Sequence, residues 1–174
     1  NEHESHYIFD LLYNNTSEVK PNVLSTDTHG VNHVNFALLD LFGYKFAPRY
    51  ANFGKVIDDL FTINVSNNKP TCIKLKKAIN IKLIAEQWDT IHRIAISLQQ
   101  KTITKATLVR KLFGYSKNHQ LLKALSEYNR LLKAMYLLEY IDDESLRGYL
   151  QRALNRGEAY HQLRRAIALS LIHI

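Results

Sequence analysis

The sequence lacks several features that define whole classes of protein. Cys72 is the only cysteine among 174 residues, so an intrachain disulfide and a cysteine-based zinc cluster are both excluded. No stretch approaches the ~18 consecutive apolar residues of a membrane-spanning helix. Residues 1–6 are polar and acidic, unlike a signal peptide. A cytosolic location therefore fits best, and the missing initiator methionine indicates an internal piece of a longer protein.

Acidic residues are fewer than basic ones. The chain has 16 Asp and Glu against 23 Lys and Arg, a formal charge of +7 and a pI of about 9.4. This excess favours a polyanionic partner, although proteins that never bind nucleic acid often show a similar one. Hydrophobic residues make up 46% and charged residues 22%, which is ordinary for a globular protein. The length suits one domain at the usual ~100–200 residues, and we find no repeat or low-complexity segment.

The first half of the chain alternates between helix and strand patterns. Apolar spacing predicts a short helix over Tyr7–Tyr13, a brief strand over Pro21–Thr26 and a helix over Asn32–Phe42. Gly43 is expected to end that helix, and Tyr44–Pro48 is the next strand candidate. The class indicated is therefore α/β at the front of the chain.

One acidic residue occupies a special place in this order. Asp27 follows the first strand directly, and Gly30 permits a chain reversal shortly afterwards. Metal-binding acids of nucleotidyl-transfer enzymes lie at such strand ends. The alternative is that Asp27 is a turn residue that caps Gly30.

The second half is expected to be helical. Residues 52–69 form a connection with one apolar piece over Ile57–Val65, and helices follow over Ile81–Leu98, Thr104–Gly114 and Leu121–Met135. Two further helices are predicted. Asp142 or Asp143 caps the first of them, which carries Leu146, Leu150 and Ala153, and the last begins around Gly157.

Five blocks of residues together resemble one protein family. The blocks are Thr26–Gly30, Leu41–Arg49, Gln87–Ala95, Leu137–Tyr140, and Leu154–Ala159 with His161. In this order and at compatible separations, from about residue 7 to Ala168, they are similar to the large replicative transposases of class II bacterial transposons, the Tn-three type. Each block is weak by itself, and the set is specific.

The resemblance implies a fold and its division along the chain. The expected class is α/β, mostly helical. It comprises a partial RNase H-like core over residues 1–60, a connection over 61–77, an all-α insertion over 78–154 and a Glu-bearing helix over 155–168. Residues 169–174 depart from the family. They match the translation of CTG TCT CTT ATA CAC ATC, the mosaic-end adapter of transposase-based sequencing libraries, so we expect an adapter-derived tail there.

The resemblance also implies an activity: Mg²⁺-dependent DNA strand cleavage and strand transfer in replicative transposition, with Mn²⁺ as a substitute. Family members use three acids, Asp, Asp and Glu. Asp27 matches the second Asp and Glu158 matches the Glu, and both are expected to bind the metal. No residue matches the first Asp, because Asp10, the only earlier Asp, lies in a segment that matches another part of the family. The fragment alone is therefore expected to be inactive.

These residue types suit that chemistry. In-line displacement at phosphorus is assisted by divalent ions, and Mg²⁺ takes carboxylate oxygens together with water and phosphate. Acids that converge from different elements are therefore needed. The alternative for Glu158 is a helix N-terminal acid that the helix dipole favours.

Several basic residues are candidate DNA contacts. His161 and Arg165 lie three and seven positions after Glu158, on the same helix face. The expected DNA-binding set is His29, Lys45, Arg49, Arg156, His161 and Arg165. Other readings stay open: His161 as a partly buried histidine or a zinc ligand, His29 as a loop-shaping residue, and Lys45 and Arg49 as surface charge.

Two function classes compete. The first is a DDE-type transposase acting on transposon ends and target DNA, which is cytoplasmic, associated with the nucleoid and not with membrane, and oligomeric with identical copies at full length. The second is a non-catalytic helical nucleic-acid-binding or interaction module. The two differ in geometry, because carboxylates of Asp27 and Glu158 more than ~10 Å apart could not share a two-metal site.

Overall fold

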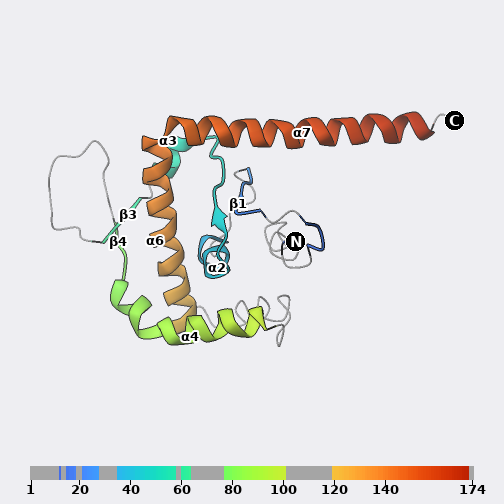
Figure 1. The fold of residues 1–174 in the computed structure, drawn as a ribbon. Helices are drawn as coiled ribbons and strands as arrows, with labels where there is room; N and C mark the ends of the chain where they lie inside the picture. Colours follow the sequence, from blue (N-terminus) through green and yellow to red (C-terminus); the bar gives the residue numbers. More distant parts are fainter. Residues whose placement is uncertain are drawn as a thin grey trace.

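The structure is a computed structural model that describes residues 12, 15–18, 21–27, 35–57, 60–63, 77–100 and 119–172. Within these residues the chain is mostly helical, with two small sheets of two strands each (Figure 1). The elements are β1 (Val23–Leu24), α2 (Asn35–Leu41), β2 (Lys45–Phe46), α3 (Phe53–Ile57), β3 (Phe61–Thr62), β4 (Lys77–Ala78), α4 (Ile81–Gln99), α6 (Gln120–Asp142) and α7 (Glu144–Ile172). The mostly helical α/β class is confirmed at this level.

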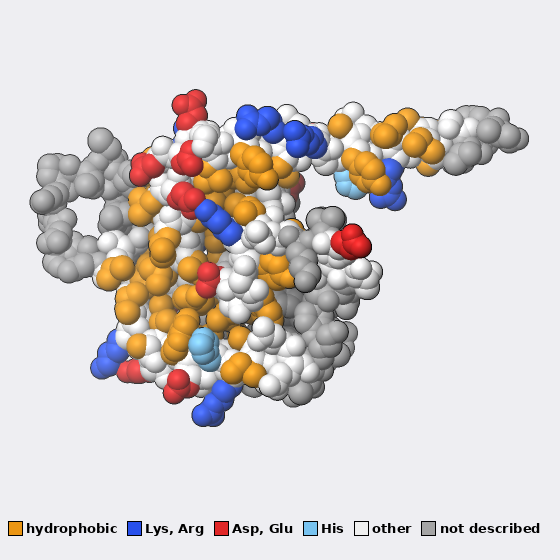
Figure 2. Space-filling model, viewed as in Figure 1, with side chains coloured by type: hydrophobic (Ala, Val, Ile, Leu, Met, Phe, Trp, Pro, Cys, Tyr) orange, Lys and Arg blue, Asp and Glu red, His pale blue; other side chains and the backbone are white. Residues whose placement is uncertain are grey.

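Helix α6 is the centre of the packing. It contacts α4, α2, β3 and α7, and its buried residues recur every three or four positions, as in a helix that faces a core. They are Leu121, Ala124, Leu125, Tyr128, Asn129, Ala134, Tyr136, Leu137 and Tyr140. Figure 2 shows hydrophobic side chains gathered over the body around this helix. The expected helix over Leu121–Met135 is therefore confirmed, as is the one over Ile81–Leu98, which is α4.

The first sheet joins β1 to β2 in parallel, with Val23 opposite Lys45 and Leu24 opposite Phe46. Helix α2 lies between these strands in the chain, and its end is marked by Gly43 at φ +76°, a backbone conformation that glycine adopts without strain. The strand, helix, glycine and strand predicted for this segment are thus confirmed. Both strands are shorter than expected.

A distant side chain bonds to the backbone of α2. Asn129 of α6 is buried, and its Oδ1 accepts a hydrogen bond of 3.2 Å from the N–H of Ala37 across 92 positions of sequence. Asn129 therefore ties α2 to α6 from inside the core.

The second sheet was not predicted. Strands β3 and β4 pair in parallel, with Phe61 opposite Lys77, and α3 precedes them. The interpretation of residues 52–69 as a connection was wrong where it covers α3 and β3. Strands of two residues show no alternation of apolar and polar positions, so periodicity cannot reveal them.

The end of the chain also differs from the prediction. One continuous helix, α7, runs from Glu144 through Gly157 to Ile172, where two helices were expected. A glycine inside a helix costs only ~1 kcal/mol relative to alanine, which is too little to end a helix of this length. The expected helices over Tyr7–Tyr13, apart from Leu12, and over Thr104–Gly114 lie outside the described residues.

Among the helices that the structure describes, none combines the length and apolar character required to span a bilayer.

Candidate functional site

The first strand delivers Asp27 to the end of a hydrogen-bonded ladder. Beyond β1 the pairing continues, because the N–H of Ala47 donates to the carbonyl of Leu24 at 2.7 Å and the N–H of Arg49 donates to that of Thr26 at 2.8 Å. Asp27 is exposed and follows directly. The sheet therefore fixes the backbone up to the residue before Asp27 while leaving its carboxylate at the surface.

Two small hydroxyls precede this carboxylate. The Oγ of Ser25 and the Oγ1 of Thr26 are buried and have no hydrogen-bond partner within the described part of the chain. Buried polar groups are usually satisfied. The strand end thus offers polar atoms beside Asp27 that still have bonding capacity.

Glu158 lies well inside α7, exposed to solvent. The helix begins at Glu144, and 158 − 144 places Glu158 14 positions further along. The expectation that it sits in the first turn of its helix was wrong. The alternative based on the helix dipole fails for the same reason, since that effect is confined to about the first turn.

The strand end and α7 meet at a cavity of about 310 Å³, lined by Val23, Leu24, Ser25, Tyr149, Leu150, Ala153 and Leu154. Leu150 is fully buried and anchors this contact. Asp27 comes two residues after Ser25, and Glu158 comes one helical turn after Leu154. The fold therefore brings together the two segments that carry the acids. The separation of the carboxylates stays a prediction.

The outer part of α7, residues 155–172, is basic. It has one acid, Glu158, and three arginines, Arg156, Arg164 and Arg165. Among the described residues, no acid forms an ion pair with Arg156, His161 or Arg165, and all three are exposed. The surroundings of Glu158 thus suit a polyanion.

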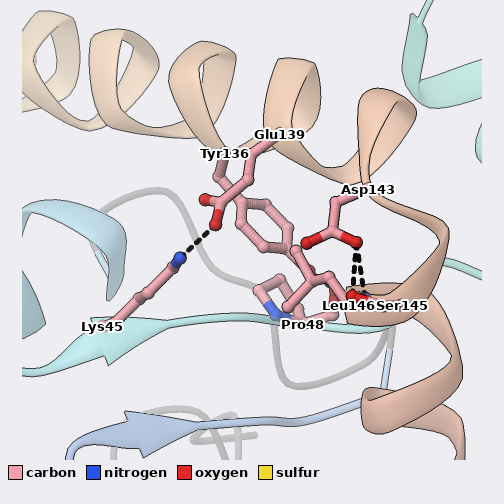
Figure 3. A network of polar contacts seen from close by, with 7 residues as sticks. All are labelled: Lys45, Pro48, Tyr136, Glu139, Asp143, Ser145 and Leu146. Carbon is pink, nitrogen blue, oxygen red and sulfur yellow. Dashed lines mark hydrogen bonds and ion pairs between the residues drawn. The ribbon is translucent and has the colours of Figure 1, made fainter.

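The remaining candidates divide between two ends of β2. Arg49 lies three residues beyond the end of β2, and its N–H donates to the carbonyl of Thr26, so it is a neighbour of Asp27. Lys45 lies at the start of β2, where its Nζ forms an ion pair with Glu139 of α6 (Figure 3). This geometry favours Arg49 over Lys45 as a neighbour of the strand end. His29 lies outside the described residues.

The sequence did not predict that a cluster of aromatic residues would help to hold the strands in place. The Oη of Tyr136 donates to the carbonyl of Pro48 at 2.7 Å, and Tyr128 bonds to Asp40. Burial, followed by repulsion from Tyr140, raises the pKa of both Tyr50 and Tyr136 far above the ordinary tyrosine range. These hydroxyls stay neutral, and that of Tyr136 acts as a structural hydrogen-bond donor. Contacts between residues 88 positions apart cannot be predicted from the local sequence.

The donor set fits a magnesium ion in part. Within the described residues, no three His, Cys, Asp or Glu side chains form a group able to hold a metal ion. Asp27 and Glu158 offer two exposed carboxylates from separate elements, and Mg²⁺ is usually held by one or two carboxylates together with water and substrate phosphate.

Comparisons with known proteins point in one direction. A family model described as the Tn3 transposase DDE domain matches residues 1–171. The chain is 36% identical over 168 residues to the transposase for transposon Tn1546 of Enterococcus faecium, covering 96% of the chain and 17% of that protein. It is 35% identical over 165 residues to the transposase for transposon gamma-delta of Escherichia coli, covering 94% and 16%. The chain thus spans about a sixth of the length of these relatives.

Proposed function

The chain belongs to the family of Tn3 transposase DDE domains, and we propose that it is part of the catalytic domain of a replicative transposase. In this proposal the complete protein cleaves DNA strands at transposon ends and joins them to target DNA. The chain supplies two of the three catalytic acids, Asp27 and Glu158. The RNase H-like core over residues 1–60 and the helical insertion over residues 78–154, which includes the first part of α7, belong to the same proposal.

One observation carries the site assignment. The segment that ends in Asp27 and the helix that bears Glu158 line one cavity, although the two acids are 131 positions apart in sequence (158 − 27). A helical module that only binds nucleic acid has no reason to join these two segments. The basic outer part of α7 supports a DNA partner beside the same cavity.

Each residue has a role in this proposal. Asp27 and Glu158 hold a divalent ion, Mg²⁺ or Mn²⁺, which when bound stabilises charge on the attacking and leaving oxygens. Arg165 and His161 share the face of Glu158 and bind the phosphate near the scissile bond. Arg49, next to Asp27, and Arg156 bind the flanking backbone. These contacts orient the phosphodiester for in-line attack.

The decisive test uses a chimera in which this chain replaces its matched segment of the Tn1546 transposase. We expect Glu158→Gln and Asp27→Asn each to lower strand transfer at least ~10³-fold, because each removes a ligand of a charge-stabilising site, while DNA affinity changes less than ~3-fold. Glu86→Gln is the matched control, since Glu86 is exposed on α4 and lies outside the five family-resembling blocks. Full strand transfer by the Glu158→Gln chimera would refute the assignment.

The isolated chain tests the role of the missing acid. We propose that it binds DNA weakly, with an affinity that falls steeply as salt rises, and does not cleave it. The measurement is fluorescence anisotropy across a salt series, together with incubation of labelled DNA with Mg²⁺. Robust cleavage by the isolated chain would contradict the need for an upstream Asp.

The alternative function is a non-catalytic nucleic-acid-binding or interaction module. It is favoured by the absence, among the described residues, of a three-ligand metal group. It predicts carboxylates of Asp27 and Glu158 more than ~10 Å apart in a crystal structure grown with Mn²⁺, too far for a shared two-metal site.

A further inference from the structure

Helix α6 supports both segments that carry the candidate acids. On one side the ion pair between Lys45 and Glu139, together with the hydrogen bond from Tyr136 to the carbonyl of Pro48, ties β2 to α6 (Figure 3). Strand β1 is in turn paired with β2. The strand that leads to Asp27 is therefore fixed in position relative to α6.

On the other side, a compact junction joins α6 to α7. Asp143 lies between the helices, and its Oδ1 accepts hydrogen bonds from the N–H of Leu146 at 3.0 Å and the Oγ of Ser145 at 2.6 Å. The Nη1 of Arg147 donates to the carbonyls of Tyr140 and Ile141 at 2.6 and 2.7 Å. These carbonyls belong to the last turn of α6, where helix carbonyls lack partners of their own. One side chain of α7 thus holds the end of α6.

Within the described part of the chain, few contacts restrain the outer part of α7. Among the side chains of α7 up to Ser170, Leu150 is the last that is fully buried, Leu154 is half-buried, and every side chain from Asn155 to Ser170 is exposed. Figure 1 shows this part of the helix extending away from the body. The position of Glu158 therefore depends on how α7 leaves the junction.

The length of the helix amplifies any change at the junction. Asp143 and Glu158 are 15 positions apart (158 − 143), or about 22 Å at ~1.5 Å per residue. A tilt of about 10° at the junction moves Glu158 by about 4 Å. Catalytic groups must be held within about 0.5 Å of their working geometry. The junction precedes the cavity-lining residues of α7, and Glu158 follows them, so a small change of angle at the junction displaces Glu158 on the far side of the cavity.

We propose that Arg147 is a positioning residue that sets the direction of α7 and thereby places Glu158 opposite Asp27. This inference rests on the proposed function of those two acids. The apolar contacts of Leu146 and Leu150 hold α7 against the body but are not directional. The Nη1 of Arg147 by itself reaches two successive carbonyls of α6, and because hydrogen bonds are directional this restricts the angle between the helices as well as making a contact.

Pulsed electron spin resonance on the full 174-residue chain tests the geometry directly. Cys72 is replaced by serine, and spin labels are attached through Lys123→Cys at the start of α6 and Gln162→Cys on the outer part of α7. We expect Arg147→Met to shift the label-to-label distance by several ångströms and to broaden its distribution. Arg152→Met is the matched control, because it removes the same group from an exposed position one turn further along α7, and it should leave the distribution unchanged.

The conservative variant separates positioning from folding. Arg147→Lys keeps the positive charge at the end of α6 on a side chain one atom shorter than arginine, so its distance distribution should lie between those of wild type and Arg147→Met. Far-UV circular dichroism checks that each variant is folded. If Arg147→Met fails to fold, the distance distribution of Arg147→Lys tests the proposal in its place. A distribution identical to wild type in the folded variant would overturn the proposal.

Activity in the Tn1546 chimera gives the second readout. Arg147→Met should lower the rate of strand transfer about 10²-fold, the cost of displacing a catalytic group by an ångström or more, with DNA affinity within ~3-fold of wild type. An unchanged rate in Arg147→Met, where Glu158→Gln is inactive, would overturn the positioning role. Normal activity of Glu158→Gln would instead refute the proposed function, and the distance measurement would still report on the junction.

Discussion

The packed body around α6 and the outer part of α7 both carry family-resembling residues, but the physical reasons for those residues differ. In the body, Phe46 packs edge-on against Phe36 with ring centroids 4.9 Å apart, and Leu137 is 1% exposed. On α7, the residues from Arg156 to His161 are all exposed. Packing explains the first set and cannot explain the second. Resemblance at exposed positions thus points to binding or chemistry.

The largest expected effect on stability comes from a leucine of the body, and a leucine on the outer part of α7 is its comparison. Leu137→Ala should lower the free energy of unfolding by about 2–4 kcal/mol, because it leaves a cavity in a close-packed core. Leu163→Ala, at a site 57% exposed on α7, should change it by less than ~0.5 kcal/mol. Urea denaturation of both variants measures the difference. Equal losses of unfolding free energy in the two variants would mean that the outer part of α7 is packed in solution. The contrast between the body and α7 would then be wrong.

Tyr136→Phe tests a single hydrogen bond between β2 and α6. The change keeps the ring but leaves the carbonyl of Pro48 without its donor, which should cost about 1–2 kcal/mol of unfolding free energy. Tyr160→Phe is the control, since Tyr160 is 61% exposed on α7. A loss no larger in Tyr136→Phe than in Tyr160→Phe would show that the bond does not hold the strand.

Lys45 distinguishes a structural role from DNA contact. Its ion pair with Glu139 is partly exposed, 46% and 43% for the two side chains, and such pairs contribute about 0.2–1 kcal/mol. Lys45→Met and Glu139→Gln should each lower stability by that amount, and the double variant should lose less than their sum. DNA affinity should be unaffected by Lys45→Met. A tenfold loss of affinity would return Lys45 to the DNA-binding set.

The smallest effect concerns pH at the junction. Hydrogen bonds from the Ser145 hydroxyl and the Leu146 N–H lower the pKa of the Asp143 carboxyl below its ordinary value. Since folding lowers this pKa, the carboxylate contributes stability above the unfolded-state pKa of ~3.9, and the contribution is lost as pH falls through the folded-state pKa. The gap in unfolding free energy between wild type and Asp143→Ala should therefore narrow between about pH 5 and pH 2. A difference in unfolding free energy that stays constant over this range would contradict the role of the Asp143 carboxylate as the cap of α7.

Helices with regularly spaced apolar residues, and the helix that ends at a glycine, could be predicted from the sequence. The apolar stripes of α4 and α6 revealed both helices, and Gly43 marked the end of α2 because a positive φ favours glycine. Periodicity did not reveal β3 and β4, which are too short to alternate. Gly157 misled the prediction of helix ends, since a glycine ends a helix only when its backbone leaves the helical region.

The site was predictable only in part. Asp27 could be placed at a strand end from local pattern, whereas Glu158 was found through family resemblance. The long-range contacts could not be foreseen: Lys45 pairs with Glu139 across 94 positions, and no local pattern encodes such a partner. The role of Arg147 could not be predicted either, because its target is a pair of backbone carbonyls, which are the same in every sequence.

The hydrogen bond from Ala37 to Asn129 has a consequence for the order of folding. It joins α2 to a helix made 92 residues later, and contacts of such separation form slowly because a long loop must close first. Until the ribosome has released α6, the aromatic residues Phe36 and Phe46 lack the surface that buries them. A nascent or truncated chain that stops before α6 should therefore require chaperones and aggregate readily. Since α7 is synthesised after α6, a chain that stops before α6 also lacks the helix that carries Glu158.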